Sequence, residues 1–203
     1  MIWYQSIPKW LQGLFPSLIW QKPDEQAVVY LTFDDGPHPD ISRWVAEQLK
    51  AYDIKATFFC VGDNVRKYPE TAAYLQSEGH RLGNHTMHHI KGWNNSTEDY
   101  IKDIELCQEQ IQTNLFRPPY GRISIKQIKA LKDKFHIVMW SLLSCDFDRN
   151  LNKEKALNGL KSKTKNGSIV VFHDSLKAEN NLRYLLPKYL EFLHQSGYTC
   201  KPL

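Results

Sequence analysis

The chain has 203 residues, which is enough for one domain with a full hydrophobic core. Hydrophobic residues make up 42% of it and charged residues 24%, close to the composition of soluble globular proteins. The formal net charge is only +4 and no dense block of Lys and Arg occurs, so nothing in the composition favours a nucleic-acid-binding protein.

The N-terminal part is aromatic and apolar in places but is interrupted by Lys9 and Pro16. It contains neither the uninterrupted apolar run of a signal peptide nor the roughly 20 apolar residues that a membrane span needs. We expect residues 7–20 to form a short amphipathic segment, within an extension over residues 1–26 that packs on a single catalytic domain over residues 27–203. The missing export signal predicts a cytoplasmic protein. Four widely spaced cysteines without a C-x-x-C pair fit reduced thiols.

Short apolar runs alternate with longer helical patterns along the chain. The expected strands are residues 27–33, 55–61, 81–84, 115–117, 136–143 and 168–173. The expected helices are residues 41–52, 64–78, 97–112, 125–134, 153–165 and 181–196. Such alternation predicts a parallel sheet with crossover helices, either an open doubly wound sheet or a closed barrel. In both, functional residues lie at the carboxyl ends of the strands.

Metal-binding residue types follow two of the expected strands. Asp34 and Asp35 come at the end of the first strand, where a Gly-Pro pair breaks it. His85 and His89 follow the third strand and are four residues apart, so they share one face of a helical turn. Two imidazoles and one carboxylate form a three-ligand site with open positions for water and substrate. His88 offers an alternative pairing.

Other candidate residues interrupt the fourth and last strands. A cation such as Arg117 is costly to bury unpaired, so we interpret it as the partner of one aspartate; the alternative is a surface loop. Pro118 and Pro119 stiffen the backbone that follows, which makes the Tyr120 N–H a candidate donor to an oxyanion. His173 closes the apolar run of the last strand, where the alternative is a histidine bonded to a neighbouring loop.

Taken together, these motifs resemble those of the polysaccharide deacetylases, the family 4 carbohydrate esterases that share the NodB-homology domain. Residues 32–37 read Thr-Phe-Asp-Asp-Gly-Pro, as in the first family motif. Residues 85–89 match H-[ST]-x-x-H, residues 117–121 fit R-x-P-x-G, and residues 171–173 fit a loose form of L-x-H. The resemblance implies an α/β fold of a particular kind, a distorted and incomplete (β/α) barrel.

The resemblance also implies a reaction, the hydrolysis of acetyl groups, above all N-acetyl groups on glycans that contain N-acetylglucosamine. Asp35, His85 and His89 would bind one divalent metal ion, usually Zn²⁺, with Co²⁺ or another divalent ion as alternatives. Asp34 would be the general base and His173 the general acid.

Further residues would surround this centre. Arg117 would polarise the base, and the Tyr120 N–H would help to hold the oxyanion. Pro118, Trp140 and Asp146 are candidates for contacts with the substrate.

One family motif, D-x-x-D-W, is altered. Alignment on Trp140 places Leu143 at the first Asp, with Asp146 and Phe147 at the second Asp and the Trp. The first Asp is the residue thought to orient the acid histidine in the family. Asp146 or Asp148 is therefore the candidate partner of that histidine here.

Three other functions stay open. Two histidines and a carboxylate also form the facial triad of non-haem iron oxygenases, although the usual setting of that site is a β-sandwich. A phosphatase of the haloacid dehalogenase type needs a second Asp two residues after the first, where this chain has Gly36. A degenerate deacetylase domain would bind glycan or metal without turnover.

The expected partner is an acetylated glycan: chitin oligomers, peptidoglycan, another cell-surface polysaccharide or acetylxylan all fit. We expect no nucleic-acid partner and no transmembrane segment, and the sequence predicts no particular oligomeric state.

Overall fold

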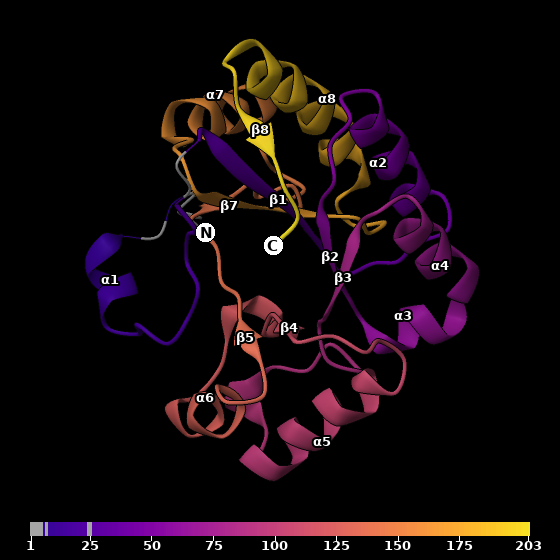
Figure 1. Cartoon of the computed structure of the whole chain (residues 1–203), viewed down its shortest axis with the longest axis vertical. Helices are drawn as coiled ribbons and strands as arrows, with labels where there is room; N and C mark the ends of the chain where they lie inside the picture. Colours follow the sequence, from indigo (N-terminus) through magenta and orange to yellow (C-terminus); the bar gives the residue numbers. More distant parts are fainter. Residues whose placement is uncertain (1–5, 7, 24–25) are drawn as a thin grey trace.

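The computed structural model describes residues 6, 8–23 and 26–203. In these residues one parallel sheet runs in the order β5-β4-β3-β2-β1-β7-β6, with β8 paired to β1. The strands are β1 (Val28–Asp34), β2 (Thr57–Cys60), β3 (Arg81–Asn84), β4 (Leu115–Phe116), β5 (His136–Ile137), β6 (Leu142–Leu143), β7 (Ser168–His173) and β8 (Thr199–Cys200). The sheet curls and the helices surround it (Figure 1), which confirms the incomplete (β/α) barrel. The short strands β4, β5 and β6 account for its distortion.

Most helices follow a strand and return the chain along the outside of the barrel (Figure 1). They are α1 (Lys9–Gly13), α2 (Ile41–Lys50), α3 (Gly62–Lys67), α4 (Pro69–Ser77), α5 (Thr97–Gln108), α6 (Ile125–Leu131), α7 (Lys153–Lys163) and α8 (Glu179–Gln195), with 3₁₀ turns η1 (Gly92–Asn94) and η2 (Pro119–Gly121). Side chains fix the starts of several helices. Ser96 caps α5, and Ser124 forms a capping box with Gln127 at the start of α6.

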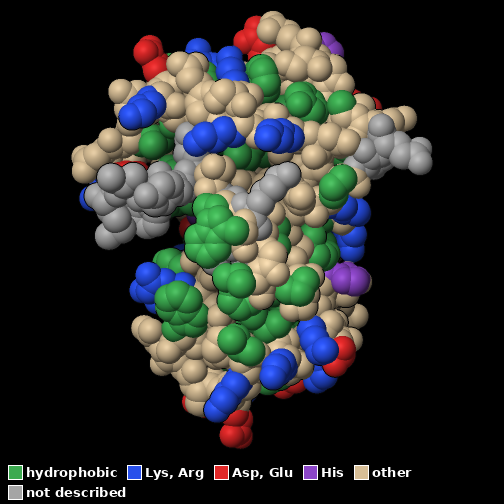
Figure 2. Space-filling view, turned by 90° about the vertical axis from the view of Figure 1, so that its left-hand side faces the viewer, with side chains coloured by type: hydrophobic (Ala, Val, Ile, Leu, Met, Phe, Trp, Pro, Cys, Tyr) green, Lys and Arg blue, Asp and Glu red, His purple; other side chains and the backbone are tan. Residues whose placement is uncertain are grey.

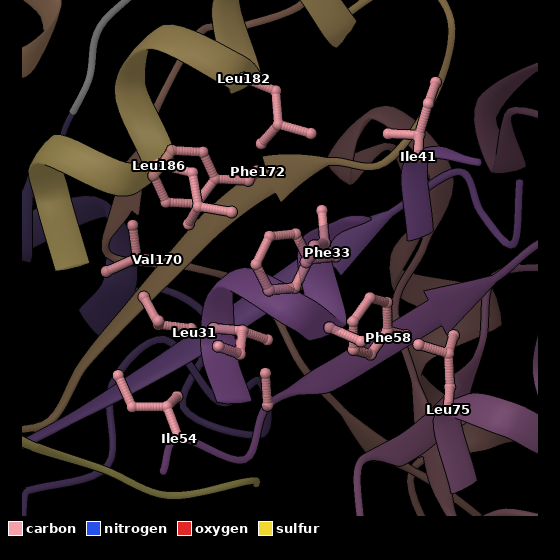
Figure 3. Close-up of a cluster of buried hydrophobic side chains, with 14 of the residues drawn as sticks. Leu31, Phe33, Ile41, Ile54, Phe58, Leu75, Val170, Phe172, Leu182 and Leu186 are labelled. Carbon is pink, nitrogen blue, oxygen red and sulfur yellow. The ribbon is translucent and has the colours of Figure 1, made fainter. Parts of the chain in front are cut away.

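The main core lies between the sheet and the helices that cover its outer face. Every residue of β1 is buried, as expected of a central strand with both faces covered. Phe33 on β1 stacks on Phe58 at 4.9 Å and on Phe172 at 6.0 Å between ring centres. Leu182 and Leu186 on α8 close this cluster from outside (Figure 3). Burial of such side chains contributes about 1.5–3 kcal/mol each, so this packing holds β1, β2 and β7 in fixed register.

Two of the expected elements are divided in the structure. The expected helix over residues 64–78 is two helices, α3 and α4, because the backbone is non-helical at Tyr68 and Pro69 lacks an N–H. The expected strand over residues 136–143 is β5 and β6 with a bend between them. Within that bend the N–H groups of Val138 and Met139 bond to different neighbours, Phe116 and Ile19. A continuous ladder with one partner strand therefore does not form.

The N-terminal segment lies beside this bend. Ile19 accepts a hydrogen bond from Met139 and donates one to Ile137, while Leu18 and Trp20 are buried in the cluster around β5 and α6. Figure 2 shows the face on which α1 lies, where hydrophobic side chains gather near the centre and Lys and Arg lie mostly around them. Of the expected amphipathic segment, residue 7 lies outside the described residues. Among the described helices, none has the length and apolar character needed to cross a bilayer.

Candidate active site

The side chains of two aspartates at the end of β1 point in different directions. Asp34 is the last residue of the strand and is only 4% exposed. Asp35 follows with a φ of 79°, a left-handed conformation that turns its side chain away from that of Asp34. Adjacent residues of one strand thus present two separate carboxylates to the same end of the barrel.

Arg117 is fully buried beside Asp34, and its side chain makes four hydrogen bonds. Its guanidinium donates to the Asp34 carboxylate and to Thr32 Oγ1, each at 2.7 Å. It also donates to the carbonyls of Val138 at 3.2 Å and Met139 at 2.9 Å. The bent segment after β5 therefore holds the cation, and the cation holds the Asp34 carboxylate in one orientation.

Asp35, His85 and His89 converge on one point, and their ligand atoms lie within 4.8 Å of one another. Asp35 Oδ1 is 3.1 Å from Nε2 of His89 and 3.7 Å from Nε2 of His85. Nδ1 of His85 donates to the Arg117 carbonyl at 2.8 Å, which leaves the Nε2 lone pair of His85 directed at the cluster. Two imidazoles and one carboxylate with one open side suit Zn²⁺ or a similar divalent ion.

The charge states of these side chains also suit metal binding. Burial lowers the pKa of His85 to about 4, so its ring is neutral at pH 7, the form that ligates a metal. Burial alone would raise the pKa of Asp35, but the hydrogen bond with His89 and the charge of His173 outweigh it and hold the pKa below its usual range. The carboxylate is therefore ionised.

The turn that carries the two histidines is fixed by Asp103 on α5. The Asp103 side chain accepts from the backbone N–H groups of Met87 at 2.9 Å and His88 at 3.1 Å. It also contacts Nδ1 of His88 at 2.5 Å. His88, the alternative ligand in the sequence, therefore turns away from the cluster, and the structure brings His85 and His89 together instead.

His173 lies at the end of β7 with Asp146 behind it. Nδ1 of His173 is 2.7 Å from one carboxylate oxygen of Asp146, and the backbone N–H of His173 donates to the other at 2.8 Å. Burial alone would lower the pKa of His173, but the charge and hydrogen bond of Asp146, followed by the charges of Asp35 and Asp34, raise it to about 9. The side chain is 13% exposed and protonated at neutral pH.

This geometry identifies the partner of His173 that the altered motif left undecided. Of the two candidates, Asp146 makes the contact. Asp146 is fully buried, so the structure places it behind His173 rather than on the surface that meets a substrate. Leu143, at the position of the family's Asp, packs against Cys145 and Val171.

Sequence reasoning missed Asp174, which fixes the turn after β1. Its carboxylate accepts from the Gly36 N–H at 3.1 Å and from the Ser42 hydroxyl, and its own N–H donates to the Asp34 carbonyl at 3.1 Å. A Cβ on Gly36 would overlap this carboxylate, so the turn requires glycine there. Burial raises the pKa of Asp174 to about 7, although the Ser42 bond opposes the shift. The only signal in the sequence was an acidic residue directly after the strand expected over residues 168–173.

A cavity of about 600 Å³ opens over these groups and contains Asp34, Asp35 and His173 in its wall. The predicted substrate residues Tyr120 and Trp140 line it as well. Tyr120 has a φ of 60° and its hydroxyl lies 3.2 Å from Nδ1 of His89, so its ring covers one side of the cluster. Pro118 is buried beneath this turn, where its carbonyl accepts from the Gly121 N–H.

Comparisons with known proteins agree with this geometry. The family model described as polysaccharide deacetylase matches residues 21–135. A peptidoglycan-N-acetylglucosamine deacetylase of Bacillus cereus is 33% identical over 186 residues, which cover 88% of this chain and 87% of that one. A chitooligosaccharide deacetylase of Azorhizobium caulinodans is 29% identical, with 88% and 93% covered. A crystal structure of a peptidoglycan N-acetylglucosamine deacetylase superposes with a TM-score of 0.83 at 26% identity, covering 97% of this chain and 95% of that one.

Proposed function

The chain belongs to the polysaccharide deacetylase family, and we propose that it is a metal-dependent hydrolase that removes N-acetyl groups from glycans containing N-acetylglucosamine. One observation carries this proposal. A three-ligand cluster, a separate buried carboxylate on Asp34 and a protonated His173 all face the same cavity. A facial-triad oxygenase needs neither of the last two groups, and a binding domain without turnover needs no separate base and acid.

Asp35, His85 and His89 would hold the metal ion, and Zn²⁺ is the ion we propose, with Co²⁺ as an alternative. When bound, such an ion supplies Lewis acidity, which acidifies a water molecule and polarises the acetyl carbonyl. The imidazole and carboxylate ligands leave one side open toward the cavity, where both water and carbonyl have room.

Asp34 acts as the general base. It pairs with Arg117 through one carboxylate oxygen and does not belong to the ligand cluster, so its other oxygen is available to take a proton from the attacking water. Arg117 fixes the orientation of this carboxylate through a 2.7 Å hydrogen bond. The backbone N–H of Tyr120, held in a turn with positive φ, is our proposed donor to the oxyanion.

His173 acts as the general acid. The amine leaves poorly without a proton, and Nε2 of His173 holds one because Asp146 raises the pKa of the ring to about 9. The base and the acid therefore come from neighbouring strands, β1 and β7, paired at Asp34 and His173.

The test is acetate release from N-acetylated chito-oligosaccharides by the purified protein loaded with Zn²⁺. We expect turnover that stops on treatment with a chelator and returns when Zn²⁺ or Co²⁺ is added. Tightly bound iron with uptake of oxygen, and no acetate from any acetylated glycan, would contradict the proposal and favour an oxygenase.

A further inference from the structure

Three cations stand around the mouth of the cavity, each against an aromatic ring. The pairs are Lys91 with Tyr120 at 4.7 Å, Arg122 with Trp93 at 5.3 Å and Lys177 with Phe147 at 5.4 Å, measured from the cationic group to the ring centre. A cation over an aromatic face is attracted to it and loses part of its freedom of movement. These side chains are thus held near the mouth instead of extending freely into solvent.

Two of these cations are part of the cavity wall. Arg122 directly follows η2, on the loop after β4, whereas Lys177 lies on the loop after β7. Within the sheet, β3, β2 and β1 separate those two strands, so the two cations approach the cavity from different sides. Both are exposed, which places their charges at the rim while the reacting groups lie deeper.

No carboxylate of the cavity wall is left to balance these charges. The acidic residues that line it are Asp34 and Asp35, and these contact Arg117 and the two histidines of the cluster. In the described part of the chain, none of the recorded ion pairs involves Lys91, Arg122 or Lys177. A divalent ion on the cluster and a protonated His173 would make the cavity still more positive.

We propose that this rim, Arg122 and Lys177 with Lys91 beside them, binds a carboxylate on the glycan, so that the preferred substrate is an acidic N-acetylated glycan and not a neutral one. This inference rests on the proposed function for the reaction itself, whereas the substrate class follows from the charges of the rim residues. A guanidinium offers two parallel donors to a carboxylate, and Lys177 adds a second point charge from the other side.

The experiment compares two oligosaccharides that differ only in the charge of their uronic acid groups. One is a tetrasaccharide of alternating N-acetylglucosamine and glucuronic acid, and the other is the same molecule with its carboxylates converted to methylamides. We expect kcat/KM at low salt to be about two- to fivefold higher for the acidic form, the range of an exposed ion pair. The ratio should fall as salt is added, because exposed charges are screened.

Variants test which residues produce this ratio. Arg122→Gln with Lys177→Gln should reduce the ratio to about one, whereas Lys161→Gln on α7, whose cation lies over Phe192 away from the cavity, should keep the wild-type ratio. An equal kcat/KM for both forms in the wild type, or a ratio that survives in the double variant, would overturn the inference.

A binding measurement separates this inference from the proposed function. Asp34→Asn protein with Zn²⁺ is titrated with both tetrasaccharides in a calorimeter. Tighter binding of the acidic form, lost with the two rim substitutions, supports the inference even if no acetate is released from any substrate. Equal affinity for the two forms overturns it whether or not the enzyme turns over.

Discussion

Arg117 is the residue on which the geometry of the base depends. Arg117→Met keeps the length of the side chain but leaves the buried Asp34 carboxylate without its cation. We expect the free energy of unfolding to fall by about 3–5 kcal/mol, as when one partner of a buried pair is removed. Denaturant unfolding measures this, with exposed Arg66→Met as the control. A loss below about 1 kcal/mol would show that Asp34 and Arg117 do not form the buried ion pair that we describe.

His173 gives a pH prediction with a definite sign. Asp146 raises its pKa to about 9, so the acid keeps its proton through neutral pH and loses it only as pH rises through that value. In Asp146→Asn the burial that lowers the pKa remains and the negative charge is lost, so the alkaline limb of the kcat profile should move to lower pH. Asp148→Asn is the matched control and should leave the limb in place. An unmoved limb in Asp146→Asn would contradict the assignment of His173 as the acid.

The sequence predicted the active-site residues better than it predicted the contacts that these residues make. Asp34, Asp35, His85 and His89 were recognisable because ionisable residues at strand ends stand out against apolar strands. The contact between Asp146 and His173 depends on how β6 pairs with β7, and no residue pattern encodes that. Asp174 was hidden for the same reason, because its partners lie 138 and 132 residues earlier in the chain.

The first turn of a helix contributes measurably to the stability of the protein. The capping box at α6 satisfies two backbone N–H groups through Ser124 and Gln127. Ser124→Ala should lower the free energy of unfolding by about 1 kcal/mol and the melting temperature by about 2–4 °C. Affinity for Zn²⁺ should not change, since the box lies outside the ligand cluster. Calorimetry on metal-free and Zn²⁺-loaded protein measures the stability and the Zn²⁺ affinity. A loss of Zn²⁺ affinity without a loss of stability would show that the capping box does not stabilise α6.

Helices and strands were predicted correctly where neighbouring residues determine where they begin and end. They were predicted wrongly where contacts with distant residues determine this. The starts of α5 and α6 follow from the serines that cap them, Ser96 and Ser124, and the apolar runs of β1 and β7 follow from burial on both faces. The break at Pro69 was readable in principle, since proline lacks the N–H that a continuous helix needs. The bend after β5 could not be predicted from the sequence, because its hydrogen-bond partners include Ile19, more than a hundred residues away.

At the scale of the whole molecule, the N-terminal segment is linked to the active site through that same bend. Trp20 is buried against the cluster of β5 and α6, and Ile19 bonds to Met139, whose carbonyl holds Arg117. Trp20→Ala should therefore cost about 3–5 kcal/mol of stability, the range of large-to-small core changes. Trp10→Ala, on exposed α1, is the control and should change little. Equal effects of the two substitutions in denaturant unfolding would refute a structural role for this segment.

In the proposed mechanism one protein group, Asp34, removes the proton from water while three others hold the metal. The direct measurement is acetate release by Asp34→Asn together with its metal content. We predict that the variant still binds about one Zn²⁺ per chain, because Asp34 is not among the ligands, and that kcat falls by a factor of about 10²–10⁴, the contribution of a general base. Full activity in Asp34→Asn, or loss of the metal along with the activity, would contradict this mechanism.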